Sequence, residues 1–345
     1  MSLTVALAVL AGLVLAALIA HGAWSAHRAS PKRAALEVPP ARVEPSLGEG
    51  QAVPAADPDE PVRTPAPALR RPALRLDALI DALVTLTLDA PVTGELALAH
   101  LPASRRAGSK PFMVEGLNAE TGEWEAPTAG QRYGEFQAGV QLANRSGALN
   151  QIEYSEFVQK LQTFAEGVGA MADFPDMLDV VARAKELDAF ANPNDAQLTA
   201  NLRANGAAWS VGYLQQSAAR HGFVAGALPG RLALPGADDS APPVLSLAFD
   251  AQAALADDSS QAAVREVTLA LDVPQTPEAA EPFAAWQQAI RGLAGEMDAA
   301  VVDHDGRPIT LQHFAGITVE LHSLYRRLEA RDLAAGTPAA RRLFS

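Results

Sequence analysis

One long apolar run near the start of the chain limits what the whole chain can become. Every residue from Leu3 to Ala20 is apolar except Thr4, and Ala23-Trp24 extends the run. At a rise of 1.5 Å per residue, about 20 helical residues cover the roughly 30 Å hydrocarbon core of a bilayer. Residues 1–27 are therefore predicted to form a transmembrane anchor, with residues 3–24 in contact with the lipid bilayer.

A cleaved signal peptide is the alternative interpretation of this run. Such a peptide carries a positive charge before a shorter apolar region and a small-residue cleavage site after it. Here the first charged side chains follow the run, at Arg28, Lys32 and Arg33. Because cationic residues stay on the cytoplasmic side of a membrane, we expect the N-terminus outside and the rest of the chain in the cytoplasm.

Composition excludes several classes of function. The chain of 345 residues has no cysteine, which excludes a disulfide framework, a cysteine nucleophile and a thiolate metal site. Its formal net charge of −13 argues against nucleic acid as a partner, because phosphate binding needs a basic surface.

A proline-rich segment follows the anchor. Ten of the 25 prolines of the chain lie between residues 31 and 75, where large apolar residues are scarce. Such a segment cannot bury enough surface to offset the entropy of ordering it. Residues 28–75 are therefore predicted to be a disordered linker that carries a cytoplasmic head.

The head shows one order of elements twice. Residues 76–192 and 193–333 each begin with a short apolar strand and a short helix, continue with two strands, and reach a long amphipathic helix, whereas residues 334–345 are a tail. One offset aligns the stripe Phe157, Leu161, Phe164 and Val168 with Trp286, Ile290, Leu293 and Met297. The first stripe continues to Met171, and residues 173–190 are expected to continue as a second helical stretch. We interpret these segments as two related α+β units; the alternative is one domain with a large helical insertion.

No catalytic constellation stands out in the sequence. It contains no phosphate-binding loop with Lys, no nucleophile elbow and no pair of His on one helical face. The densest polar cluster, Asp303-His304-Asp305, precedes Gly306-Arg307-Pro308 and is typical of a solvated turn. We therefore predict no enzyme, no metal site, no cofactor and no small-molecule substrate.

Three short motifs lie along the chain. The anchor ends in Leu18-Ile19-Ala20-His21-Gly22-Ala23-Trp24, which contains a His-Gly step followed by Trp. Later come Ser246-Leu247-Ala248 and a Val-Thr strand, residues 267–274, that ends in Val-Pro. These motifs resemble the end of the anchor, the central strand and the late strand of the ZipA family of bacterial cell-division proteins. The order of anchor, proline-rich linker and α+β head is the layout of the family. Residues 77–190 depart from it, because single-domain relatives lack them.

The resemblance implies a fold and a function. It implies an antiparallel sheet with helices packed on one face, in a head held at the bacterial inner membrane. It also implies binding of the carboxyl-terminal tail of FtsZ, the tubulin-like division protein, across the open sheet face, which tethers the division ring to the membrane. An anchored interaction or scaffold protein of another pathway is the alternative.

Strand alternation indicates which residues would form such a face. In the strand 267–273 the residues Val267, Leu269, Leu271 and Val273 are expected inward. The candidate partner-binding residues are those that alternate outward on this strand and on two others: Thr199, Asn201, Ser246, Ala248, Thr268 and Ala270. They are smaller and more polar than the groove of the family, so a plain solvated sheet face is the alternative.

Overall fold

Two antiparallel sheets, each with its own long helix, make up the head. The computed structural model describes residues 75–236, 242–256, 258, 262–309 and 311–345. The predicted anchor and all of the predicted linker except Arg75 lie outside the described residues. In the part that is described, no helix is long and apolar enough to cross a membrane.

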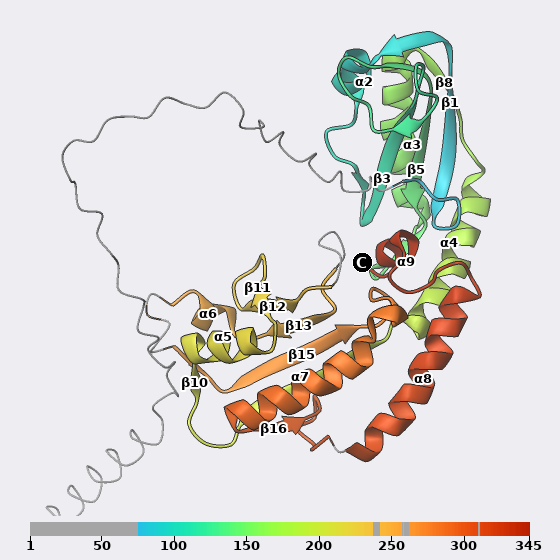
Figure 1. Cartoon of the computed structure of the whole chain (residues 1–345). Helices are drawn as coiled ribbons and strands as arrows, with labels where there is room; N and C mark the ends of the chain where they lie inside the picture. The colour runs from blue at the N-terminus through green and yellow to red at the C-terminus, as the bar shows by residue number, and fades with distance from the viewer. Residues whose placement is uncertain (1–74, 237–241, 257, 259–261, 310) are drawn as a thin grey trace, which may run out of the picture.

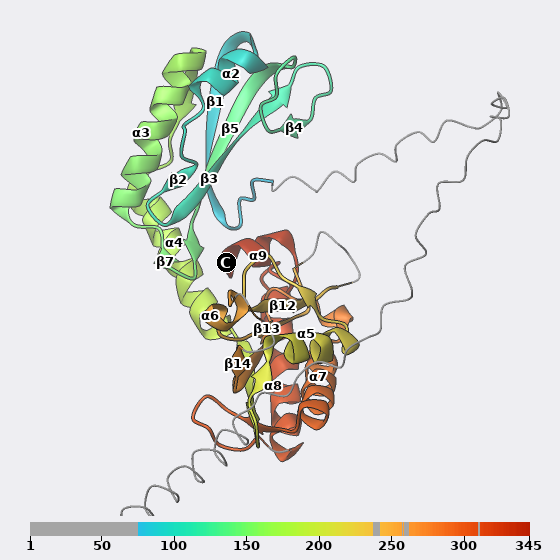
Figure 2. The same ribbon diagram turned by 90° about the vertical axis from the view of Figure 1, so that its left-hand side faces the viewer.

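The first unit, residues 76–192, is a sheet backed by helix α3 (Figures 1 and 2). Its strands in spatial order are β2-β3-β5-β1-β8, and β4 pairs with β3. The elements of this unit, in chain order, are β1 (Asp81–Thr93), α2 (Gly94–His100), β2 (Arg106–Ala107), β3 (Lys110–Asn118), β4 (Trp124–Glu125), β5 (Arg132–Gln141), β6 (Ala143–Asn144), β7 (Gly147–Ala148), α3 (Gln151–Val168), β8 (Ala170–Asp173) and α4 (Met177–Ala191). The 3-10 turn η1 (Asn192–Asn194) leads from this unit into the second.

The second unit, residues 193–333, has its strands in the order β11-β12-β13-β15-β9-β16. The elements of this unit and of the residues after it are β9 (Gln197–Ala204), β10 (Trp209–Ser210), α5 (Val211–Arg220), β11 (Val224–Ala225), β12 (Arg231–Leu234), β13 (Leu245–Ala248), α6 (Ala251–Ala254), β14 (Ala263–Val264), β15 (Glu266–Asp272), the 3-10 turn η2 (Glu278–Ala280), α7 (Pro282–Met297), β16 (Ala299–Val302), α8 (Leu311–Glu329) and α9 (Pro338–Leu343).

The two sheets share one topology. The order β2-β3-β5-β1-β8 of the first corresponds strand by strand to β12-β13-β15-β9-β16 of the second. In each unit the first long strand leads into a short helix, and the long helix leads into the strand at one edge of the sheet. The long helices α3 and α7 end alike. The offset that aligns Phe157 with Trp286 also aligns Gly169 with Asp298, and both of these residues adopt left-handed backbone conformations at the end of their helix.

Aromatic side chains join α3 to the sheet of the first unit. Phe112 on β3 meets Phe157 edge-on with ring centroids 5.4 Å apart, and Phe136 on β5 meets Phe164 at 5.3 Å. All four side chains are buried. In the second unit α7 packs along β15, β9 and β13 in the same way (Figure 1). The prediction of α+β units with antiparallel sheets and helices is thus confirmed.

Two predictions at the end of α3 were wrong. Met171 was expected on the apolar stripe of the long helix, but it lies on β8 and is 80% exposed. The helix stops at Val168 because Gly169 takes a φ of 72°, a left-handed conformation that glycine adopts without steric cost. The second helical stretch was expected from residue 173, but α4 begins at Met177, where the carboxylate of Asp176 caps it.

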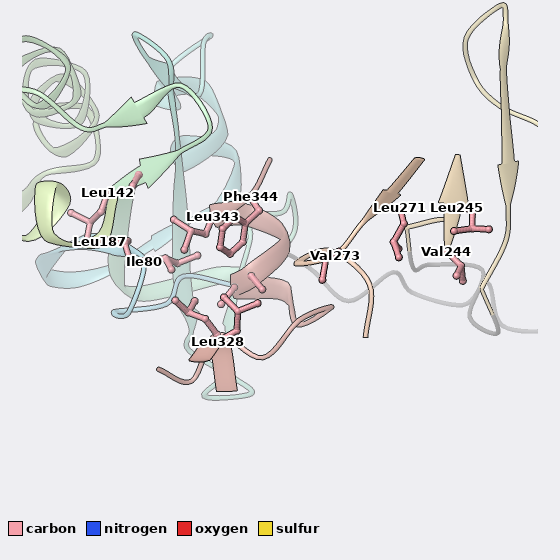
Figure 3. Close-up of a cluster of buried hydrophobic side chains, with 14 of the residues drawn as sticks. Ile80, Leu142, Leu187, Val244, Leu245, Leu271, Val273, Leu328, Leu343 and Phe344 are labelled. Carbon is pink, nitrogen blue, oxygen red and sulfur yellow. The ribbon is translucent and has the colours of Figure 1, made fainter. Parts of the chain in front are cut away.

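The predicted tail, residues 334–345, folds into the junction between the units. Helix α9 lies there, and Figure 3 shows Leu343 and Phe344 beside Ile80 of the first unit, with Leu328 of α8 close by. All four are buried and belong to one hydrophobic cluster that includes core residues of both units. The guanidinium of Arg342 pairs with the buried carboxylate of Asp81 at 2.8 Å.

Candidate binding face

Strand β15 separates a buried face of the second sheet from an exposed one. Val267, Leu269, Leu271 and Val273 are at most 1% exposed, as the alternation predicts. Thr268, Ala270 and Asp272 point to the opposite side and are partly exposed. Because α7 packs on the buried side, the opposite side is the open face of the second unit.

All six candidate residues lie together on this open face. Across β13, β15 and β9, the pairing aligns Ser246 with Ala270 and Thr199 in one row. The same pairing aligns Ala248 with Thr268 and Asn201 in a second row. The hydroxyl of Thr268 donates a hydrogen bond to Oδ1 of Asn201 at 2.9 Å, which ties two strands together on this face. The structure therefore brings the predicted residues into two neighbouring rows.

Strands β11 and β12 extend both rows, and sequence reasoning missed them. Val224 and Ala233 continue the first row, and Arg231 continues the second beside Ala248. Val224 is 52% exposed. Strand β11 has two residues and β12 has four, so both are too short to show a periodic pattern in the sequence. The signal that could have found them is the turn between them, Gly226-Ala227-Leu228-Pro229-Gly230, which is typical of a hairpin.

Charged residues border the open face. Arg203 binds Glu266 across β9 and β15, with Nε and Oε2 3.0 Å apart. At the end toward the first unit, Arg145 donates to the carboxylates of Asp195 and Asp272. Burial at this junction raises the pKa of Asp272, although the hydrogen bond and charge of Arg145 oppose the shift.

Arg231 differs from these bordering arginines. Among the described residues, no carboxylate forms an ion pair with its guanidinium, and the residue is exposed. Arg231 is therefore a cation on the open face that is available to an incoming anion.

The first unit has a corresponding open face with a different surface. Its central row holds Glu115, Gln137, Thr85 and Asp173, and Gln137 donates to Glu115 at 2.8 Å. The chain itself covers one end. The backbone N–H of Leu76 donates to Glu115 at 3.2 Å, and the Leu76 side chain lies so close over Gly139 that a Cβ there would come within 2.6 Å of it.

The Asp303-His304-Asp305 cluster forms a turn, as predicted. Oδ1 of Asp303 accepts backbone hydrogen bonds from Asp305 at 2.9 Å and Arg307 at 2.8 Å. The hydrogen bond from Arg307 and that from Asp305 lower the pKa of Asp303, although its limited burial opposes the shift. In the described ranges, no group of three or more His, Asp or Glu side chains is placed to hold a metal ion.

A small hollow lies on the helical side of the second unit, away from the open face. His221, Gln287 and Arg291 are among the residues that line it, between the end of α5 and helix α7. His221 lies 3.1 Å from the carboxylate of Glu296 and packs over Gly292. These contacts fasten α5 to α7.

No protein-family model matches the chain, and no curated protein matches it. The likeness to the ZipA family therefore rests on the short motifs of the anchor, of β13 and of β15, together with the layout of the chain.

Proposed function

We propose that this protein is a bacterial inner-membrane tether that binds the carboxyl-terminal tail of FtsZ on the open face of its second unit. The binding residues are Thr199, Asn201, Ser246, Ala248, Thr268 and Ala270. The observation that carries the proposal is their position in two adjoining rows on an exposed sheet face. In this proposal the protein acts by binding, without catalysis, and its N-terminal residues hold it to the membrane. The shared strand order also leads us to infer that the two units are diverged copies.

The physics of the face suits a short peptide. Alanine, serine and threonine side chains leave the sheet surface shallow, so a peptide backbone can approach it closely. Burial of apolar side chains of the peptide would contribute about 25 cal/mol per Å² to the free energy of binding. The entropy cost of ordering the peptide offsets part of this gain. The affinity of one site should therefore be modest. Many copies on one membrane that face a polymer would add avidity.

The test is a titration of the full chain in detergent with a fluorescent peptide of the FtsZ tail, followed by anisotropy. Ala270→Glu should abolish binding, because it places a carboxylate between Ser246 and Thr199 where apolar side chains would rest. The fold should persist, because Ala270 is partly exposed. Ala219→Glu on α5 is the matched control, since this exposed alanine lies on the helical side.

Unchanged binding by Ala270→Glu would refute the assigned face. A second candidate function, a scaffold of another pathway, is favoured by the polarity of Thr199, Asn201 and Thr268. It would be supported if the parent chain ignored the FtsZ tail while Ala270→Glu still removed a different protein partner in a cell-based crosslinking experiment.

A further inference from the structure

The two open faces of this protein differ in charge. On the second unit the carboxylates of Glu266 and Asp272 are paired with Arg203 and Arg145, whereas Arg231 has no carboxylate partner among the described residues. On the second unit, Arg231 is exposed at one end of the row that continues through Ala248, Thr268 and Asn201. On the first unit, the corresponding rows carry Glu115, Glu135 and Asp173. A peptide with carboxylates would be attracted to the second face and repelled by the first.

The second face also offers apolar contact next to its cation. Ala233 lies two residues after Arg231 on β12, in the neighbouring row. Val224 on β11 pairs with Ala233 in that same row. Neighbouring strands lie about 4.8 Å apart, so the row from Arg231 to Asn201 spans about 14 Å. An extended peptide of about four residues covers that length.

The first face is closed at one end by the chain itself. Leu76 lies over Gly139, and its backbone N–H occupies an oxygen of Glu115. A peptide would have to displace Leu76 before it reached the middle of this sheet. Both the charge and the cover therefore disfavour an acidic peptide on the first unit.

We propose that the second unit selects an acidic, apolar peptide, with a carboxylate of the peptide on Arg231 and an apolar side chain against Val224 and Ala233. This inference rests on the proposed function, and it adds the chemistry of the peptide that the second unit takes. Arg231 acts here as a specificity-determining residue, because its guanidinium forms an ion pair with a carboxylate of the peptide. The small, uncharged residues of the face cannot distinguish a carboxylate from an amide.

The experiment uses the full chain in detergent and the FtsZ tail peptide, at 50 mM and at 500 mM sodium chloride. A second peptide has its carboxylates converted to amides. Arg231→Gln should weaken binding of the first peptide about fivefold at low salt, the upper range for an exposed ion pair. It should leave binding of the amidated peptide unchanged. High salt should remove most of the difference between parent and variant, because it screens exposed charges.

Two matched variants separate the outcomes. Arg291→Gln removes an equal charge from the exposed surface of α7 and should not change binding. Glu135→Gln alters the face of the first unit and should not change it either. If the parent binds and Arg231→Gln binds as tightly at low salt, this inference is wrong and the proposed function stands. A Glu135→Gln variant that binds the peptide more tightly than the parent, as the loss of a repulsive charge would cause, would move the site to the first unit. No binding by the parent chain would refute the proposed function itself.

Discussion

At the scale of single residues, Trp286 shows how the second unit is stabilised. Its side chain is 2% exposed and lies between Phe283, stacked at 5.9 Å, and Phe314, edge-on at 5.9 Å. Within the described residues, the indole Nε1 has no hydrogen-bond partner. The contribution of Trp286 therefore comes from packing of α7 against α8.

We predict that Trp286→Ala lowers the free energy of unfolding by about 3 to 5 kcal/mol, because it leaves a large cavity in this aromatic cluster. Trp286→Phe should lower the free energy of unfolding by less, since an aromatic ring still fills part of the site and Nε1 makes no hydrogen bond within the described residues. Urea denaturation followed by circular dichroism measures both. An unchanged midpoint for Trp286→Ala would mean that the indole is not buried as the structure places it.

At the scale of elements, α9 is a helix that only its surroundings make possible. A helix of six residues is too short to be stable in isolation. Thr337 caps it, Pro338 stands at a favoured first position, and Leu343 is buried in the junction. Arg342 is 8% exposed and pairs with Asp81, which is fully buried.

Arg342→Ala should destabilise the protein by about 3 to 5 kcal/mol, because it leaves the buried carboxylate of Asp81 without its charge partner. The neighbouring Arg341→Ala is the control and should cost much less, since none of the described acids pairs with Arg341. Thermal unfolding of the two variants provides the comparison. Equal losses would show that the ion pair contributes nothing beyond the packing of the arginine side chain.

At the scale of the whole molecule, the two units meet at one junction, where the first described residue, Arg75, also lies. The carbonyl of Arg75 accepts a hydrogen bond from Arg342 at 3.2 Å, so the start of the described chain lies beside its end. Arg145 of the first unit binds Asp195 and Asp272 of the second across the same junction.

The membrane orientation is predicted from the charges that follow the apolar run. A fluorescent protein that folds only in the cytoplasm, fused after the exposed Ser345, should be bright. Alkaline phosphatase at the same position should be inactive, because it needs the periplasm. Replacing Arg28, Lys32 and Arg33 with Glu should reduce the preference for a cytoplasmic C-terminus, since cationic residues near a membrane span set its orientation. Phosphatase activity of the parent fusion would contradict the orientation.

The apolar face of the long helices and the two sides of the long strands could be predicted from the sequence alone. Alternation along 267–273 and the stripe from Phe157 to Val168 depend on side-chain directions, which are fixed within a few residues. Those directions were sufficient to put Thr268 and Ala270 on the open face. They failed at Met171, because the left-handed conformation of Gly169 ended the helix while the apolar spacing continued.

Contacts between distant segments could not be predicted from local patterns and became visible in the three-dimensional structure. The alignment of Ser246, Ala270 and Thr199 depends on the register between three strands, and periodicity within one strand does not specify that register. Arg231 and Val224 joined the face because a short hairpin added two strands to the edge of the sheet. The burial of Phe344 and Arg342 likewise required the first unit to be present, because neither the six residues of α9 nor their local sequence can supply the surface that covers them.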